Sequence, residues 1–148
     1  MRKVLLAFVF ALPVLVLSSC VYTPKSLYSW GGKINGTSMY EEYAYKHYKS
    51  QSPEALCGLL VTYESMINNP GGERMVPPPG ICAEYGYMLL DPETARVFAE
   101  TATDRQKSMI VRTDYAEYGV ELLQREIEYY PEAKKFIEPI INRIKHQD

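Results

Sequence analysis

Residues 52–69 read SPEALCGLLVTYESMINN, and this segment indicates which class of fold the chain adopts. Ser52 is a typical helix N-cap, and Pro53 follows at the first helical position, where the N–H that proline lacks would have no partner. Apolar side chains then recur every three or four residues, which places them on one helical face: Leu56, Leu59, Leu60, Tyr63, Met66 and Ile67. The segment predicts an amphipathic helix over residues 53–69, packed against a core.

A helix is also expected over residues 38–49, because Ser38 and Glu41 have the spacing of a capping box. One face of this helix gathers Tyr40, Tyr43, Ala44, His47 and Tyr48. Such a stripe either packs into the core or forms a partner surface, on which tyrosine rings are buried while their hydroxyls stay hydrated. The sequence leaves both alternatives open.

Two more helices are expected in the middle of the chain, over residues 81–90 and 115–130. Asp114 and Glu117 have capping-box spacing at the start of the second of these helices. A short helix between them begins at Asp91-Pro92, a cap residue followed by proline.

The segments on either side of the 115–130 helix complete the pattern. Residues 103–113 carry the weakest pattern, and Ser108-Met109-Ile110-Val111 within them fit either a helical turn or a short extended piece. The last helix opens at Pro131, and Pro139 inside it predicts a kink. Strand signals are nearly absent, so the sequence predicts an all-α domain over residues 38–148. The inward-facing stripe of the last helix is expected to be Ala133, Phe136, Ile137, Ile140, Ile141 and Ile144.

The N-terminus has the layout of a secretory signal. Arg2 and Lys3 are basic, and residues 4–17 form an apolar run of about 14 residues. A membrane-spanning helix needs roughly 20 such residues. We therefore expect residues 1–19 to be a signal peptide that is removed, not a retained transmembrane helix.

The run ends in Leu17-Ser18-Ser19-Cys20, which resembles the lipobox of bacterial lipoproteins. There the cysteine becomes the first residue after cleavage, and its thiol is acylated. The resemblance implies that Cys20 carries acyl chains such as palmitate, and two or more chains hold a protein firmly on a bilayer. Val21 follows the cysteine where an Asp would favour inner-membrane retention. The expected location is therefore the outer membrane, with the domain facing the periplasm and surface display as the alternative.

Residues 20–37 are expected to form a tether between the lipid and the domain. Its glycines and asparagine disfavour a stable helix, but its aromatic residues are too dense for a plain linker. Tyr28 and Trp30 are expected either to dock on the domain or to lie at the lipid interface.

Composition argues against nucleic acid as a partner. Without residues 1–19 the chain has 129 residues, and its formal charge changes from −2 to −4 because Arg2 and Lys3 are lost. No block of basic residues remains.

The sequence also lacks a pattern typical of an active site, a metal site or a cofactor site. His47 and His146 are far apart, and the carboxylate pairs Glu41-Glu42 and Glu126/Glu128 are expected to be solvated. Cys57 and Cys82 would lie about 15 Å apart along antiparallel helices, which is too far for a disulfide. We therefore expect two buried thiols, no enzymatic activity, no metal and no cofactor.

Tyr85-Gly86, together with Gly119, Leu123 and Pro131, resembles the tetratricopeptide repeat. The first pair matches a large residue and a glycine in the first helix of the repeat. The other three match the small, large and terminal proline positions of its second helix. The two glycines are 33 residues apart here, and about 12 in the repeat. The resemblance therefore implies tetratricopeptide-like helical hairpins with an inserted short helix.

The whole layout resembles a family of small Gram-negative outer-membrane lipoproteins that have no assigned activity. Members are typically encoded beside a lipoprotein resembling the curli-secretion pore subunit, which implies an envelope assembly and other lipoproteins as partners. The resemblance offers no catalytic residues, and residues 91–113 depart from it. It rests on Leu17-Ser18-Ser19-Cys20, Leu27-Tyr28-Ser29-Trp30-Gly31, the 40–48 helix, Val76-Pro77-Pro78 and Tyr129-Tyr130-Pro131-Glu132.

These patterns favour a lipid-anchored helical adaptor, in which paired helices form a groove for a helix or an extended segment of an envelope partner. The candidate contact residues are Trp30, Tyr40, Tyr43 and Tyr48. The alternative is a carrier lipoprotein that binds lipid or glycan in a cavity between the helices.

Overall fold

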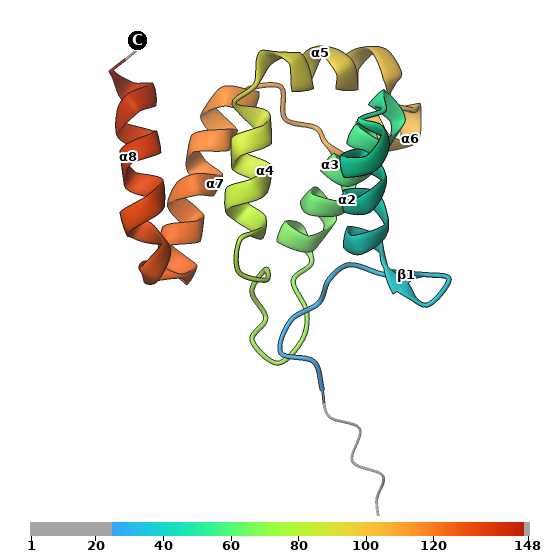
Figure 1. Ribbon diagram of the computed structural model, residues 1–148, viewed down its shortest axis with the longest axis horizontal. Coiled ribbons are helices and arrows are strands. Elements are labelled where there is room, and N and C mark those ends of the chain that lie inside the picture. The colour runs from blue at the N-terminus through green and yellow to red at the C-terminus, as the bar shows by residue number, and fades with distance from the viewer. Residues whose placement is uncertain (1–24, 147–148) are drawn as a thin grey trace, which may run out of the picture.

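The computed structural model describes residues 25–146, which form a mainly α-helical fold (Figure 1). The predicted signal peptide and the predicted acylation site at Cys20 lie outside the described residues. Within residues 25–146, none of the helices is both long and apolar enough to span a membrane. In chain order the elements are β1 (Lys33–Ile34), β2 (Thr37–Ser38), α2 (Met39–Ser50), α3 (Pro53–Asn68), α4 (Ile81–Leu89), α5 (Pro92–Thr101), α6 (Asp104–Met109), α7 (Tyr115–Tyr129), the 3₁₀ turn η1 (Pro131–Ala133) and α8 (Lys134–Lys145).

α3 is the central helix, because α2, α4, α5 and α6 all pack against it. It starts as predicted: the Ser52 hydroxyl accepts a hydrogen bond from the Ala55 N–H at 3.2 Å, and Pro53 is the first helical residue. The predicted apolar face is buried, and so are Thr62 and Glu64 outside it. The helix is therefore enclosed on more sides than its amphipathic pattern indicates.

α4 and α7 lie side by side and touch backbone to backbone (Figure 1). A Cβ atom added to Gly86 would lie 2.7 Å from the Gly119 carbonyl oxygen, and one added to Gly119 would lie 2.7 Å from the Gly86 carbonyl oxygen. Real Cβ atoms do not approach oxygen so closely, so only glycine fits at either position. α5 and α6 are the chain segment between these two helices.

The two predicted capping boxes have different outcomes. The box at the start of α2 is confirmed, because the Glu41 N–H donates to the Ser38 hydroxyl at 3.1 Å and the Glu41 carboxylate accepts from the Ser38 N–H at 3.2 Å. The box of Asp114 and Glu117 is wrong. The Asp114 carboxylate binds the guanidinium of Arg112 instead, and makes no side-chain cap for α7.

Residues 103–113 combine both of the alternatives that the sequence left open. Thr103 and Gln106 form a capping box that starts α6. The helix ends at Met109, and Ile110 is extended, with φ −112° and ψ 92°. Ile110 is also buried, so the extended piece contributes to the core.

α8 is the outermost helix of the described chain, since its main contacts are with α7 and η1. Ile137 and Ile141 of its predicted stripe are buried. Phe136 was expected to face inward, but 68% of its surface is exposed, because no further helix covers that side. Pro139 lies inside α8, which runs on to Lys145.

The N-terminal tether docks on the domain and contains a small hairpin. Tyr28 packs its ring edge-on against Tyr130, with ring centroids 6.4 Å apart. β1 and β2 pair antiparallel, and their two-residue connection is Asn35-Gly36, with φ values of 52° and 89°. Asn-Gly is a strong signal for such turns. The prediction of an all-α domain did not take this signal into account.

The two cysteines of the described chain agree with the sequence prediction. Cys57 and Cys82 are buried free thiols. Burial raises the pKa of the Cys82 thiol to about 12, so it stays protonated at neutral pH.

The contact between α4 and α7 predicts the effect of adding one methyl group. Gly86→Ala should lower the free energy of unfolding by about 1–3 kcal/mol in urea denaturation, because the added carbon is blocked by backbone that cannot move aside. Gly58→Ala is the control, since the three atoms nearest to its added Cβ all belong to the ring of Tyr43, a side chain on α2 that can shift. We expect a smaller loss there, and equal stability of Gly86→Ala and the unaltered protein would contradict the close contact.

Candidate functional site: a groove between α2, α4 and α8

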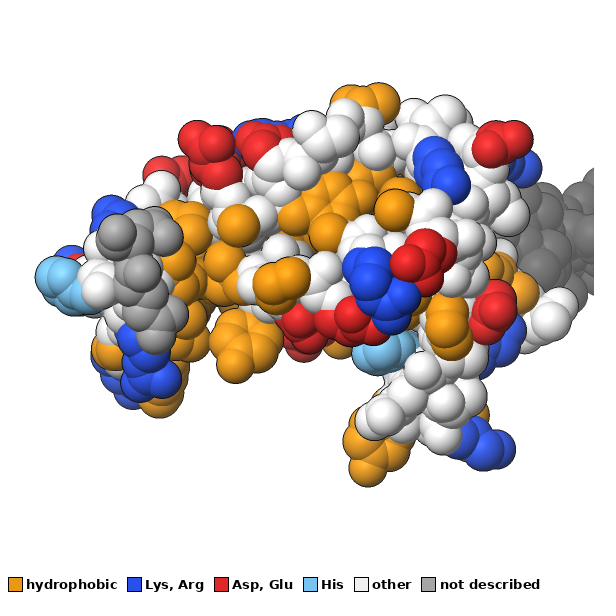
Figure 2. All heavy atoms as spheres, turned by 90° about the horizontal axis from the view of Figure 1, so that it is seen from above, with side chains coloured by type: hydrophobic (Ala, Val, Ile, Leu, Met, Phe, Trp, Pro, Cys, Tyr) orange, Lys and Arg blue, Asp and Glu red, His pale blue; other side chains and the backbone are white. Residues whose placement is uncertain are grey.

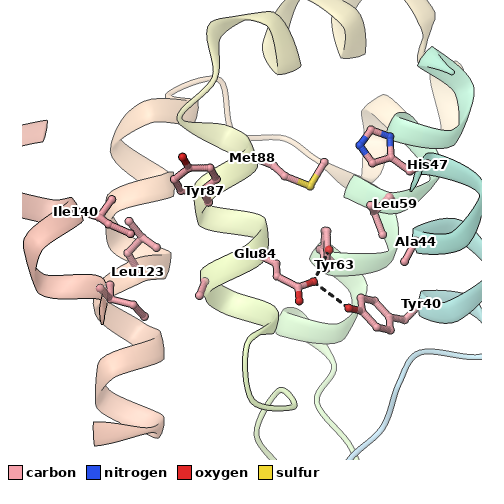
Figure 3. Close-up of a pocket in the computed structure, with 12 residues that line it drawn as sticks. Tyr40, Ala44, His47, Leu59, Tyr63, Glu84, Tyr87, Met88, Leu123 and Ile140 are labelled. Carbon is pink, nitrogen blue, oxygen red and sulfur yellow. Dashed lines mark hydrogen bonds between the residues drawn. The ribbon is translucent and has the colours of Figure 1, made fainter. Parts of the chain in front are cut away.

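A groove of about 500 Å³ runs across α4 between α2 on one side and α8 on the other. Figure 2 shows the surface hollowed between these two projecting helices, with hydrophobic side chains along the hollow. The lining residues come from five helices, as Figure 3 shows in close-up. They are Tyr40, Ala44, His47, Leu59, Tyr63, Ala83, Glu84, Tyr87, Met88, Leu123, Ile137 and Ile140.

Glu84 is the only Asp, Glu, Lys or Arg among the described residues that line this groove. Its carboxylate accepts hydrogen bonds from the hydroxyl of Tyr40 at 2.9 Å and from the hydroxyl of Tyr63 at 2.7 Å (Figure 3). Burial, together with the hydrogen bond to Glu84, raises the pKa of Tyr40 to about 12. The pKa of Tyr63 is raised further for the same reasons. Both hydroxyls therefore remain donors at physiological pH, and they hold the carboxylate in place.

A second carboxylate, that of Glu64, lies deeper, between α3, α4 and α7. It accepts hydrogen bonds from the hydroxyl of Tyr85 at 2.9 Å, the hydroxyl of Tyr118 at 3.4 Å and the side-chain amide of Asn68 at 2.8 Å. Burial first, and the nearby Glu64 charge second, raise the pKa of Tyr118 to about 12. The pKa of Tyr85 is raised more strongly.

Five aromatic rings form a continuous row from the tether into the core. Trp30 packs on Tyr40 with ring centroids 5.3 Å apart, and Tyr40 on Tyr63 at 5.9 Å. The row continues from Tyr63 to Tyr85 as a stacked pair at 5.5 Å, and from Tyr85 to Tyr118 edge-on at 6.0 Å. Such contacts add to the free energy of burying the rings. They link the tether, α2, α3, α4 and α7 through one set of side chains.

A third carboxylate sets the position of α4. Glu126 of α7 is buried and accepts hydrogen bonds from the N–H of Gly80 at 2.7 Å and of Ala83 at 3.2 Å. Burial raises the pKa of Glu126, and the backbone donors oppose that shift. Glu126 and Glu128 were both expected to be solvated. That expectation is wrong for Glu126, whose side chain accepts hydrogen bonds from the first N–H groups of α4. It is right for Glu128, which is exposed.

The four predicted contact residues do not all meet at the groove. Tyr40 lines it, and Trp30 packs on Tyr40 from the tether. Tyr43 instead lays its ring over Gly58 of α3, and Tyr48 is 85% exposed and is not a lining residue. No residue of α2 is fully buried, so the aromatic face of this helix is partly solvent-accessible rather than sealed in the core.

Sequence patterns did not single out the floor of the groove, which α4 forms, or the wall that α8 forms. Tyr87 and Ile140 lie there, and Tyr87 is 64% exposed. The signal available in the sequence was Tyr87 itself, which lies two residues from Tyr85 and so cannot share the same helical face. Ile140 belongs to the predicted inward stripe of the last helix, and that prediction hid the wall that Ile140 forms.

His47 lies at the rim where α2 meets the groove (Figure 3). Its Nδ1 is buried and has no hydrogen-bond partner among the described residues. Across residues 25–146, no group of three or more His, Cys, Asp or Glu side chains is arranged to hold a metal ion.

Comparison with known proteins yields no match: no protein-family model, no curated protein and no solved structure is similar to this chain.

The network around Glu64 predicts the effect of removing one hydroxyl. Tyr85→Phe should lower the free energy of unfolding at pH 7 by about 1.5–3 kcal/mol, because a buried carboxylate loses a donor. Tyr45→Phe is the matched control, since Tyr45 is 61% exposed and should change nothing.

The same variants test the raised tyrosine pKa values. Folding stabilises the protonated hydroxyls, so their contribution is fully present below pH 10 and is lost as the pH rises toward 12. The unaltered protein should lose stability above pH 10, and Tyr85→Phe should lose less. Identical urea midpoints for Tyr85→Phe and Tyr45→Phe at pH 7 would contradict this account of the network.

Proposed function

We propose that this protein is a lipid-anchored helical adaptor of the bacterial envelope, and that its groove binds a helix or an extended segment of a partner protein. The observation that carries the proposal is the groove itself, which is about 500 Å³ in volume, is mostly apolar and is open between α2 and α8. Tyr87 stands in it with most of its surface exposed. An amphipathic segment laid across α4 would cover these side chains.

The groove also suggests the chemistry of the partner segment. Its lining is apolar apart from Glu84, the tyrosine hydroxyls and His47. Because Tyr40 and Tyr63 fix the Glu84 carboxylate, the charge is already in place when a partner arrives. We therefore expect a segment with several apolar side chains and one Lys or Arg that reaches Glu84.

The proposal includes a tetratricopeptide-like arrangement of the helices. α2 with α3, and α4 with α7, would be two helical hairpins, and α5 and α6 would be the insertion within the second hairpin. The contact between Gly86 and Gly119 supports this pairing. In such an arrangement the first helix of each hairpin and the terminal helix, here α2, α4 and α8, line one concave surface.

The proposed anchor is an acylated Cys20 after removal of residues 1–19. It places the domain at the outer membrane, facing the periplasm, where other envelope lipoproteins are the expected partners, a curli-secretion-pore-like subunit among them. The support is Leu17-Ser18-Ser19-Cys20 and the resemblance to small outer-membrane lipoproteins. No catalytic residue, metal or cofactor forms part of the proposal.

The second candidate is a carrier that binds lipid or glycan between the helices, and the apolar lining favours the acyl chain of a lipid. The two proposals differ in what accompanies the protein after mild extraction from membranes. Native mass spectrometry should detect a bound protein for the adaptor, and a bound lipid or glycan for the carrier.

Site-specific photocrosslinking in intact cells tests the adaptor. Benzoylphenylalanine in place of Tyr87 should form a discrete adduct with an envelope protein, and the change Ile140→Lys should abolish that adduct by placing a charge in the apolar wall. Benzoylphenylalanine in place of Tyr45 is the matched control, because Tyr45 is 61% exposed but lies outside the groove. The same adducts at both positions, or none at Tyr87, would refute the proposed binding surface.

The anchor has its own test. Cys20→Ser should abolish incorporation of radiolabelled palmitate and move the protein from the membrane fraction to the soluble fraction, because no acyl chain remains to bind the bilayer. Cys57→Ser should change neither result, since that thiol is buried. Palmitate incorporation that persists in Cys20→Ser would show that the acylated residue lies elsewhere.

A further inference from the structure

We propose that one end of the domain rests on the bilayer, and that Leu27 and Met75 are the residues that enter the lipid interface. This inference deepens the proposed function and rests on the lipid anchor at Cys20. The surface consists of residues 25–29 of the tether and the α3–α4 loop at residues 70–76. Figure 1 shows the first described residues and this loop at the same end of the molecule, with α5 at the opposite end.

The tether and the loop are joined along their backbones. The N–H of Ser29 donates to the Gly71 carbonyl at 3.2 Å, the N–H of Glu73 to the Ser26 carbonyl at 3.0 Å, and the N–H of Arg74 to the Leu27 carbonyl at 3.1 Å. The fit is tight at Gly72, where an added Cβ would lie 2.6 Å from the Leu27 carbonyl oxygen. The tether therefore cannot move away from the loop without breaking these bonds.

The joined segments expose two large apolar side chains. Leu27 is 54% exposed and Met75 is 63% exposed. Met75 also has φ 54°, a left-handed backbone that residues other than glycine rarely adopt. Lys25 and Arg74 flank this pair and Glu73 is the one acidic neighbour in the loop. Apolar side chains beside basic ones suit the interface of an anionic bilayer.

The segment between Cys20 and Lys25 is short, and this keeps this end of the domain near the membrane. Four residues lie between Cys20 and Lys25. The five steps from Cα to Cα span at most about 3.6 Å each in a fully extended chain, or about 18 Å in all. An acylated Cys20 lies at the bilayer surface, so Lys25 cannot be further from that surface than this distance. Because residues 26–29 are bonded to the loop, Leu27 and Met75 lie within reach of the headgroups.

A lipid-quenching experiment on the full acylated protein tests the orientation. Met75→Cys, Leu27→Cys and Val111→Cys would each be labelled with the fluorophore NBD. Cys57 and Cys82 are buried and Cys20 is acylated, so only the new thiol reacts. Val111 is the control, because it is strongly exposed and lies on the α6–α7 connection, away from the α3–α4 loop. The proteins would be reconstituted into vesicles of phosphatidylethanolamine and phosphatidylglycerol that contain spin-labelled phospholipid.

We expect several-fold greater quenching at positions 27 and 75 than at position 111. Equal quenching at the three positions, in protein that still floats with the vesicles, would overturn the orientation and leave the anchor intact. Protein that neither floats with the vesicles nor carries acyl chains would overturn the anchor, and the orientation with it. Circular dichroism of each variant checks that the fold is retained.

Discussion

The backbones of α4 and α7 touch at Gly86 and Gly119, where a Cβ atom on either residue would lie 2.7 Å from the carbonyl oxygen of the other. Because neither glycine carries a side chain, the two backbones approach closely enough for their neighbours to interlock. Tyr118 of α7 reaches Glu64 of α3. The face of α4 that is turned away from this contact becomes the floor of the groove. A larger residue at either glycine would separate α4 from α7 and so displace the α8 wall, because α8 packs on α7.

Three carboxylates then join these helices through hydrogen bonds, and two of them, those of Glu64 and Glu126, are buried. Glu84 binds Tyr40 of α2, a helix without any fully buried residue. Glu64 joins α3 to α4 and α7, and Glu126 holds the first turn of α4. A buried carboxylate is costly without donors, so Glu64 and Glu126 each favour the helix arrangement that supplies those donors. The hydrogen bonds from Tyr40 and Tyr63 also hold the charge of Glu84 in position within the groove.

Local signals in the sequence predicted local structure well. The cap at Ser52, the box of Ser38 and Glu41 and the stripe of α3 depend on neighbours within one turn of a helix, and each is present. Asp114 failed as a cap because Arg112, two residues away, binds its carboxylate. Phe136 and Glu126 failed for a longer-range reason. Whether a helical face is covered depends on which helices lie beside it, and periodicity carries no such information. The groove depends on the same arrangement, so of its lining residues only Tyr40, Ala44 and His47, from the predicted stripe of α2, were anticipated as a possible partner surface.

The central claim is that a partner segment occupies the concave surface between α2, α4 and α8. Hydrogen–deuterium exchange, compared between the purified acylated protein and the same protein in outer-membrane vesicles, tests it most directly. The account predicts slower exchange of α2 and α4 in the vesicles, because a bound segment excludes water from the groove, and unchanged exchange of α5 at the far end. Exchange that is equal in both preparations along α2 and α4, or protection confined to α5 and α6, would contradict the account.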